Sequence, residues 1–132
     1  MADGMKVKII TPEKQFYEGN ADMIELTTTE GDIGVYPEHI PLTAVVAPGV
    51  LKIHEGKKVK EAALISGFLT IMPDAVTIMA EIAEWPDEID FARAEQARVR
   101  AQRRLSEHSP EMDVARAEMA LKRALVRLGL KH

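Results

Sequence analysis

The sequence predicts a β + α protein. An antiparallel β-sandwich or barrel in residues 1–86 is followed by an antiparallel two-helix hairpin in residues 87–132. Short runs of alternating polar and apolar residues indicate the strands, and seven of the eight glycines and six of the seven prolines supply turns between them. Two alanine-rich stretches with helical periodicity indicate the hairpin, and all eight arginines lie in them, from Arg93 onward.

The first strands are predicted from alternation and from β-branched residues. Turn residues at Thr11–Lys14 and Gly19–Asn20 separate three runs, residues 5–10, 15–18 and 23–29. We expect Gly19–Asn20 to end the second strand. Glu30–Gly31–Asp32 is typical of a hairpin turn.

The next stretch, residues 31–42, holds two glycines and two prolines, which predicts a tightly routed loop. Further turn signals then divide the chain into five short strands: residues 43–46, 51–53, 59–65, 68–72 and 76–82. So many short strands joined by tight turns are typical of an antiparallel sandwich or barrel.

The helices are predicted from caps and apolar stripes. Pro86 disfavours helical continuation from Trp85, Asp87 is the expected first cap, and Ser109 and Pro110 are expected to start the second helix. Each helix carries one narrow apolar stripe, made of Ala94, Ala97, Ala101 and Leu105 in the first and Ala117, Leu121, Ala124 and Leu128 in the second. Because alanine buries little area, we expect a weak seam that can open at modest cost.

The hairpin register predicts a charged site. With the fold-back near residues 108 and 109, Asp90 lies opposite Arg127, and Arg93 lies opposite Ala124. Arginines from both helices, including Arg123, then meet at the open end beside the sandwich, with Arg100 farther along the first helix. An anion such as a polyphosphate would relieve their repulsion. The pattern alone favours a solvated surface with helical ion pairs worth a few tenths of a kcal/mol over such an anion site.

Composition excludes several classes of function. Net charge is −4, so bulk attraction to nucleic acid or anionic membrane is not expected. The absence of cysteine excludes disulfides and thiolate chemistry, and the four histidines show no metal-ligand spacing. No phosphate-binding loop, nucleophile elbow or catalytic triad is visible. The chain lacks a signal peptide and a membrane-spanning run, so we expect a cytoplasmic protein that reaches a membrane only through partners.

Three motifs resemble one family. They are the Gly-x-x-Gly-Val-x-Pro-x-His-x-Pro-Leu run at 31–42, Ser-Gly-Phe-Leu at 66–69 and Ile-Asp-x-x-Arg-Ala at 89–94. Over its full length the chain resembles the epsilon subunit of bacterial F-type ATP synthase. Tyr36 departs from the leucine or phenylalanine expected at its position.

The resemblance implies a non-catalytic central-stalk subunit on the cytoplasmic face of the bacterial plasma membrane. Its implied partners are the gamma subunit and the ring of c subunits, which residues 1–86 would bind. We expect those contacts to involve Gly31, Tyr36, Pro37, His39 and Pro41.

The resemblance also implies that residues 87–132 regulate ATP hydrolysis. The hairpin lies folded on the sandwich, where ATP binds, or extends into the catalytic head and inhibits. The ATP contacts it implies are Glu84, Asp90, Arg93 and Arg100, with Arg123 and Arg127 as further phosphate partners. In the extended state we expect contacts to the alpha and beta subunits from Arg98, Arg103, Arg104 and Arg116.

The only expected cofactor is ATP as a regulatory ligand, because no ligand set for a metal or redox group is visible. Two alternatives stay open. One is a free-standing nucleotide-sensing module without a rotary partner, which copurification with gamma would exclude. The other is an enzyme, which the absence of a nucleophile–base pair disfavours.

Overall fold

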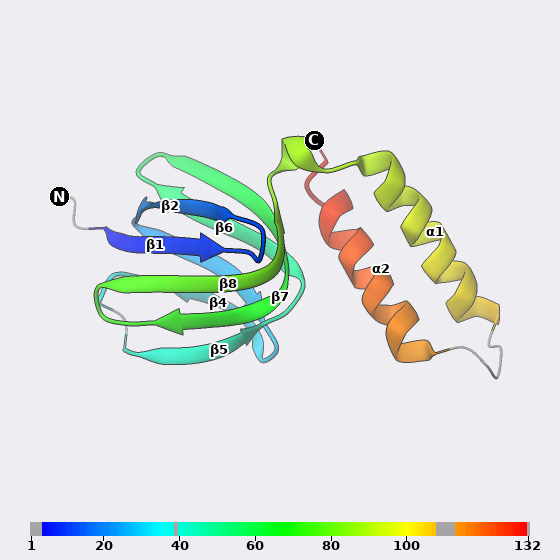
Figure 1. Ribbon diagram of the computed structural model, residues 1–132, viewed down its shortest axis with the longest axis horizontal. Coiled ribbons are helices and arrows are strands. Elements are labelled where there is room, and N and C mark those ends of the chain that lie inside the picture. The colour runs from blue at the N-terminus through cyan, green and yellow to red at the C-terminus, as the bar shows by residue number, and fades with distance from the viewer. Residues whose placement is uncertain (1–3, 39, 108–112, 132) are drawn as a thin grey trace.

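The structure is a computed structural model that describes residues 4–38, 40–107 and 113–131. In these residues, eight strands fill the first two-thirds of the chain and two α-helices fill the last third (Figure 1). The predicted sandwich and hairpin are confirmed. The strands are β1 (Met5–Ile10), β2 (Gln15–Ala21), β3 (Met23–Thr28), β4 (Gly31–Val35), β5 (Leu42–Val46), β6 (Gly49–Glu55), β7 (Lys58–Ile71) and β8 (Ala75–Glu84). A 3₁₀ turn, η1 (Pro86–Glu88), leads into α1 (Phe91–Glu107), and α2 (Val114–Leu128) follows.

The long strand β7 joins the two parts of the sandwich. Its first half pairs with β6 and its second half with β5, while β8 runs antiparallel along most of its length. The order of hydrogen-bonded neighbours is β2-β1-β8-β7-β5-β3-β4. The strand β6 lies off this path and pairs with both β3 and β7. Among the described strands, β1 and β8 form the one parallel pair.

Three local predictions were wrong. The strand β2 continues through Gly19, whose lack of a side chain leaves room for the Tyr17 hydroxyl, since a Cβ there would lie 2.6 Å from it. Residues 31–35 of the predicted loop form β4 and pair with β3. The two strands expected around Ser66–Gly67 are one, because Gly67 takes a φ of 150° that keeps the chain in register with β8.

The main core lies between the sheet layers. It is built from the inward-facing aliphatic residues of the strands, such as Ile9, Ile24, Leu51 and Ile78, all fully buried. Trp85 closes one end, with its ring stacked on Phe16 at a centroid distance of 4.3 Å. The tryptophan therefore packs on the sandwich at the start of the linker to the helices.

The helix caps differ from the prediction. Asp90, not Asp87, caps α1, because its Oδ1 accepts a hydrogen bond from the Arg93 backbone N–H at 3.0 Å. Asp87 lies instead in η1. Asp113 caps α2 in the same way through the Arg116 N–H. The predicted cap Ser109 and first residue Pro110 lie outside the described residues.

Alanines form the helix–helix seam, as predicted. Ala94, Ala101, Ala117 and Ala124 are buried between α1 and α2, and the larger stripe residues Leu105, Leu121 and Leu128 are half-buried. Neither described helix is long and apolar enough to cross a bilayer.

The hairpin docks on the sandwich through a second, small core. Ile89 of the linker and Leu130 beyond α2 bury themselves against Ala63 of β7, with Val50 and Val126 packed around them. The helix α2 lies between α1 and the sandwich (Figure 1). This docking places the start of α1, the end of α2 and the end of β8 next to one another.

Candidate functional site

A groove of about 480 Å³ opens where these three ends meet. Five of the six residues predicted for an anion site line it: Glu84, Asp90, Arg93, Arg100 and Arg127. Glu88 of η1 and the small side chains of Ala94 and Ala97 complete the lining. The groove is therefore made by the linker, by one face of α1 and by the last turn of α2.

Helical spacing explains which residues of α1 face the groove. Asp90, Arg93, Ala97 and Arg100 follow one another at intervals of three or four, so they share one side of the helix. The alanines hold no polar group and leave space, while the long arginines above and below them carry the charge. Arg100, which we placed away from the open end, reaches the same groove.

The three carboxylates of the groove already have hydrogen-bond donors. Glu84 accepts from Arg127, with Oε1 lying 2.7 Å from Nε and Oε2 lying 3.4 Å from Nη2. Asp90 accepts the Arg93 backbone N–H as the helix cap. Glu88 accepts the Trp85 backbone N–H at 2.9 Å and pairs with Lys14 Nζ at 3.3 Å. Each of the three carboxylates therefore already accepts at least one hydrogen bond from the protein.

Two arginine side chains of the groove have no partner among the described residues. Within the described residues, the guanidinium groups of Arg93 and Arg100 form no hydrogen bond and no ion pair. Each offers five N–H donors in a planar fork that suits phosphate and carboxylate. Two unpaired guanidiniums on one wall, with Arg127 on the other, give the groove the N–H donors that an anion with several oxygens would need.

Hydrogen bonding favours the charged form of Glu88. The Trp85 N–H and, to a lesser extent, the Lys14 ammonium stabilise the charged carboxylate of Glu88, which lowers its pKa below the ordinary value. A charged, partnered carboxylate accepts hydrogen bonds but donates none. The groove can therefore receive N–H and O–H donors of a ligand on this side and its anionic oxygens on the other.

The sixth predicted residue, Arg123, is half-buried on α2 and does not line the groove. The sequence reasoning also missed Glu88 and its partner Lys14. Lys14 is 74 positions away along the chain, and only the docking of η1 against the β1–β2 turn brings the two together. The spacing of Glu88 three residues after Trp85, typical of a capping box, was the one available signal.

The four arginines expected to contact other subunits lie outside the groove. Arg98 is held on α1 by Glu95 and by Gln102, the latter at 2.6 Å. The nearby guanidinium of Arg98 also lowers the pKa of the Glu95 carboxyl. Arg103, Arg104 and Arg116 are exposed, and the structure shows no ion pair between them and any described residue.

Three of the described residues expected to contact a rotor, Tyr36, Pro37 and Pro41, lie at the other end of the sandwich. The backbone N–H of Glu38 donates to Pro73 O at 3.2 Å, which ties residues 36–38 to the β7–β8 turn, far from the helices (Figure 1). Tyr36 is 56% exposed there, Pro37 is half-buried and Pro41 is exposed. Gly31 is exposed at the helix end instead, in the β3–β4 turn, where it lines a hollow together with Leu125 and Val126 of α2. His39 lies outside the described residues.

Two family models match the chain, one over the sandwich and one over the helices. A family model described as ATP synthase, delta/epsilon chain, beta-sandwich domain matches residues 4–86. A second, described as ATP synthase, delta/epsilon chain, long alpha-helix domain, matches residues 87–130.

Relatives of known sequence extend across most of the chain. An ATP synthase epsilon chain of Halalkalibacterium halodurans is 42% identical over 103 residues, which are 78% of this chain and 77% of that one. An ATP synthase epsilon chain of Caldanaerobacter subterraneus subsp. tengcongensis is 45% identical over 102 residues, 76% of this chain and 74% of that one.

Solved structures share the fold. A chain in the Euglena gracilis mitochondrial ATP synthase superposes with a TM-score of 0.83 at 23% identity, over 98% of this chain and 81% of that one. With both domains matched in order and relatives above 40% identity, the chain belongs to the delta/epsilon chain family of ATP synthases.

Proposed function

We propose that this chain is a non-catalytic epsilon subunit of the central stalk of a bacterial F-type ATP synthase. In this role the sandwich couples the gamma subunit to the ring of c subunits, and the helix hairpin regulates ATP hydrolysis. Membership of the family and the epsilon-chain relatives support the assignment. The protein would then lie at the cytoplasmic face of the membrane and be held there by its partners.

The end of the sandwich opposite the helices supports a rotor contact. Large apolar side chains are exposed there, with Tyr36 at 56%, Ile40 at 78% and Met72 at 50%. Apolar groups gathered on one surface are typical of a protein interface. Tyr36, Pro37 and Pro41 are the residues of this end that we assign to the c-ring and gamma contact. Gly31, at the helix end, and His39 stay predicted contacts.

The groove is proposed to bind ATP, and the observation that carries this proposal is the pair of unpaired guanidiniums, Arg93 and Arg100. These arginines and Arg127 would hold phosphate oxygens in charge-assisted hydrogen bonds. Glu84 and Asp90 would accept donors of the base or sugar. Arg123 stays a proposed phosphate partner that could reach the ligand from the flank of α2.

Binding to the groove would control the hairpin because the groove exists only when the hairpin is folded. Its walls come from the linker, from α1 and from α2, so a ligand that spans them favours the folded state over any extended one. A shift from 1:99 to 99:1 needs about 5.5 kcal/mol of preference for the folded state. The alanine seam contributes only a small packing energy to the folded hairpin, so the ligand would supply much of this preference.

In the extended state, the outer arginines would contact the catalytic subunits. Arg103, Arg104 and Arg116 are exposed, and Arg98 can exchange Glu95 for an acidic partner elsewhere. Exposed guanidiniums attract acidic surfaces and pair with their carboxylates.

Two experiments test this function. The tagged chain should copurify with gamma and c subunits, and Tyr36→Asp should weaken retention of the c-ring while leaving the helices unaffected. Reversal of the four outer arginines to glutamate should relieve inhibition of hydrolysis in the reconstituted enzyme. A chain that copurifies with no rotor subunit would contradict the proposal and favour a free-standing nucleotide sensor.

A further inference from the structure

A second hollow shares a wall with the groove. It encloses about 320 Å³ between the β1–β2 turn and the end of β8, and its lining includes Glu84 and Glu88, both of which also line the groove. Glu13 and Glu81 add two more carboxylates, and Lys14 is the only cation among the described residues that line it. These two shared glutamates therefore separate an acidic hollow from an arginine-lined groove.

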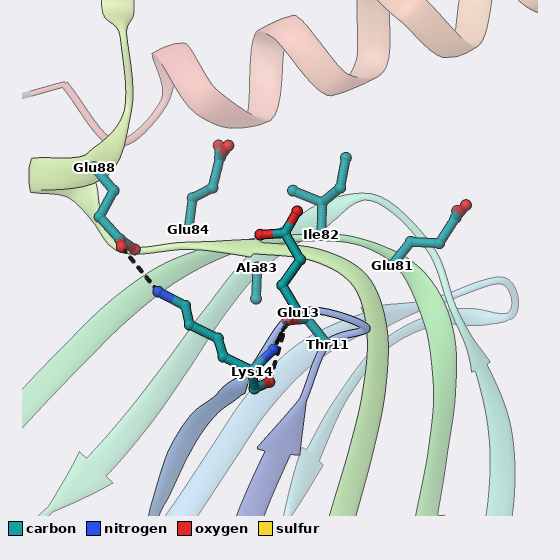
Figure 2. Close-up of a pocket in the computed structure, with 8 residues that line it drawn as sticks. All are labelled: Thr11, Glu13, Lys14, Glu81, Ile82, Ala83, Glu84 and Glu88. Atoms are coloured by element: carbon teal, nitrogen blue, oxygen red, sulfur yellow. Dashed lines mark hydrogen bonds and ion pairs between the residues drawn. The ribbon is translucent and has the colours of Figure 1, made fainter.

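Each shared glutamate is held from a different side. In Figure 2, Glu84 points towards α2, where Arg127 binds it, while Lys14 extends from the β1–β2 turn to Glu88. Glu88 uses one oxygen for Lys14 and the other for the Trp85 N–H. The sandwich itself thus supplies the counter-ion for a carboxylate of the groove.

The turn that carries Lys14 is rigid enough to position it. Thr11 N–H donates to Lys14 O at 2.9 Å, and Lys14 N–H donates to Thr11 Oγ1 at 3.3 Å. A side chain on a hydrogen-bonded turn is held closer to one geometry than a side chain on an open loop. Lys14 is 54% exposed, so its charge is screened but not lost.

We propose that Lys14 is a positioning residue for the anion groove. Lys14 holds Glu88 against the Trp85 amide and neutralises the Glu88 carboxylate, so that Arg93 and Arg100 stay available to phosphate. The inference rests on the proposed function, because it concerns the affinity of the same groove. Without Lys14, the Glu88 carboxylate would keep the Trp85 N–H but lose its cationic partner, beside two unpaired guanidiniums. It would compete with phosphate from within the molecule, at a high effective concentration.

The first test is an ATP titration of the full chain by calorimetry. Lys14→Ala should raise the Kd for ATP by about two- to fivefold, the range expected for an exposed pair. Lys14→Arg should restore most of the affinity. Lys57→Ala is the matched control, because Lys57 carries the same charge in the exposed β6–β7 turn and lines neither cavity.

A double-mutant cycle separates positioning from general stability. Glu88→Gln removes the competing charge but leaves a carbonyl oxygen for the Trp85 N–H. In that background, Lys14→Ala should leave the ATP affinity unchanged within error. Emission of Trp85, the only tryptophan, should shift in Lys14→Ala without ligand, because Lys14 no longer holds the Glu88 carboxylate that accepts from the Trp85 amide.

The outcomes are distinguishable. If the unmodified chain binds ATP and Lys14→Ala binds it equally well, the positioning role is overturned and the proposed ATP site survives. An equal loss of affinity in the wild-type and Glu88→Gln backgrounds would also overturn it, since Lys14 would then act without Glu88. An unmodified chain that binds no ATP would overturn the proposed site and this inference together.

Discussion

Arg127 near the end of α2 and Glu84 at the end of β8 form a two-contact ion pair, with Nε lying 2.7 Å from Oε1. Their side chains are 25% and 28% exposed. Two parallel N–H···O contacts fix the angle between helix and sandwich better than a single point charge would. The pair therefore acts with the small apolar core around Ile89 and Leu130 to hold the hairpin on the sandwich.

Glu84→Gln should lower the free energy of unfolding by about 1 kcal/mol, because a part-exposed charged hydrogen bond is lost and Arg127 keeps no carboxylate partner. Urea denaturation followed by Trp85 fluorescence measures the change. Glu81→Gln is the control, since Glu81 lies exposed on the same strand and forms no ion pair within the described residues. Equal destabilisation in both variants would show that Glu84 has no special role in docking.

Gly67→Ala should destabilise the sandwich by more than about 2 kcal/mol. A Cβ at Gly67 would lie 2.1 Å from Met79 O, and the φ of 150° disfavours any side chain. Gly34→Ala provides the comparison, because a Cβ there meets only ordinary contacts at 3.8 Å. The midpoint temperature of thermal unfolding of Gly67→Ala should be well below that of Gly34→Ala. Similar midpoints would mean that the strand relaxes around Gly67.

The Tyr17–Glu55 hydrogen bond should make stability sensitive to alkali. Burial, followed by the hydrogen bond and the charge of Glu55, raises the pKa of Tyr17 above its ordinary value near 10. The folded state then keeps Tyr17 neutral while the unfolded chain ionises it. The contribution is therefore complete below about pH 10 and is lost as the pH rises further.

Tyr17→Phe removes this titration. The difference in unfolding free energy between wild type and Tyr17→Phe should be constant up to about pH 9.5 and shrink above it. Urea denaturation at a series of pH values measures it. Parallel curves through pH 11 would show that the Tyr17 hydroxyl has the same pKa in both states.

Ala124→Leu should loosen the hairpin without disturbing the sandwich. Ala124 is only 1% exposed in the seam, and added volume there costs about 1–3 kcal/mol. Amide hydrogen exchange should speed up across α1 and α2 and stay unchanged in β7 and β8. The control is Ala115→Leu on the exposed side of α2. Unchanged exchange in the Ala124 variant would mean that the helices separate easily enough to accommodate leucine.

Sequence periodicity was enough to predict the architecture because strands and helices bury one face each. The alternation of Val7 and Ile9 with lysines and the spacing of Ala117, Ala124 and Leu128 are direct consequences of that burial. The errors arose where tertiary contacts override local signals. Gly19 and Gly67 look like breaks, yet each lies inside a strand because a neighbouring group needs the space that a side chain would fill.

The candidate site was partly predictable for the same reason. Helical spacing and hairpin register predict that Asp90, Arg93 and Arg127 lie together, because both depend only on regular geometry. Lys14 could not be found in this way, since its contact with Glu88 depends on how the 3₁₀ turn packs against the sandwich. The exact direction of Arg123 on its helix also depends on local packing.

We propose that the folded hairpin presents the unpaired guanidiniums of Arg93 and Arg100 to ATP. Calorimetric titration of the full chain with ATP tests it most directly, with Arg93→Ala, Asp90→Ala and Arg100→Ala beside the exposed control Arg103→Ala. We predict saturable binding of ATP to the unmodified chain. Each groove variant should weaken the affinity by about tenfold or more, the effect of losing a charged hydrogen bond. The control Arg103→Ala should leave the affinity unchanged. No heat of binding, or equal affinity in all variants, would contradict it.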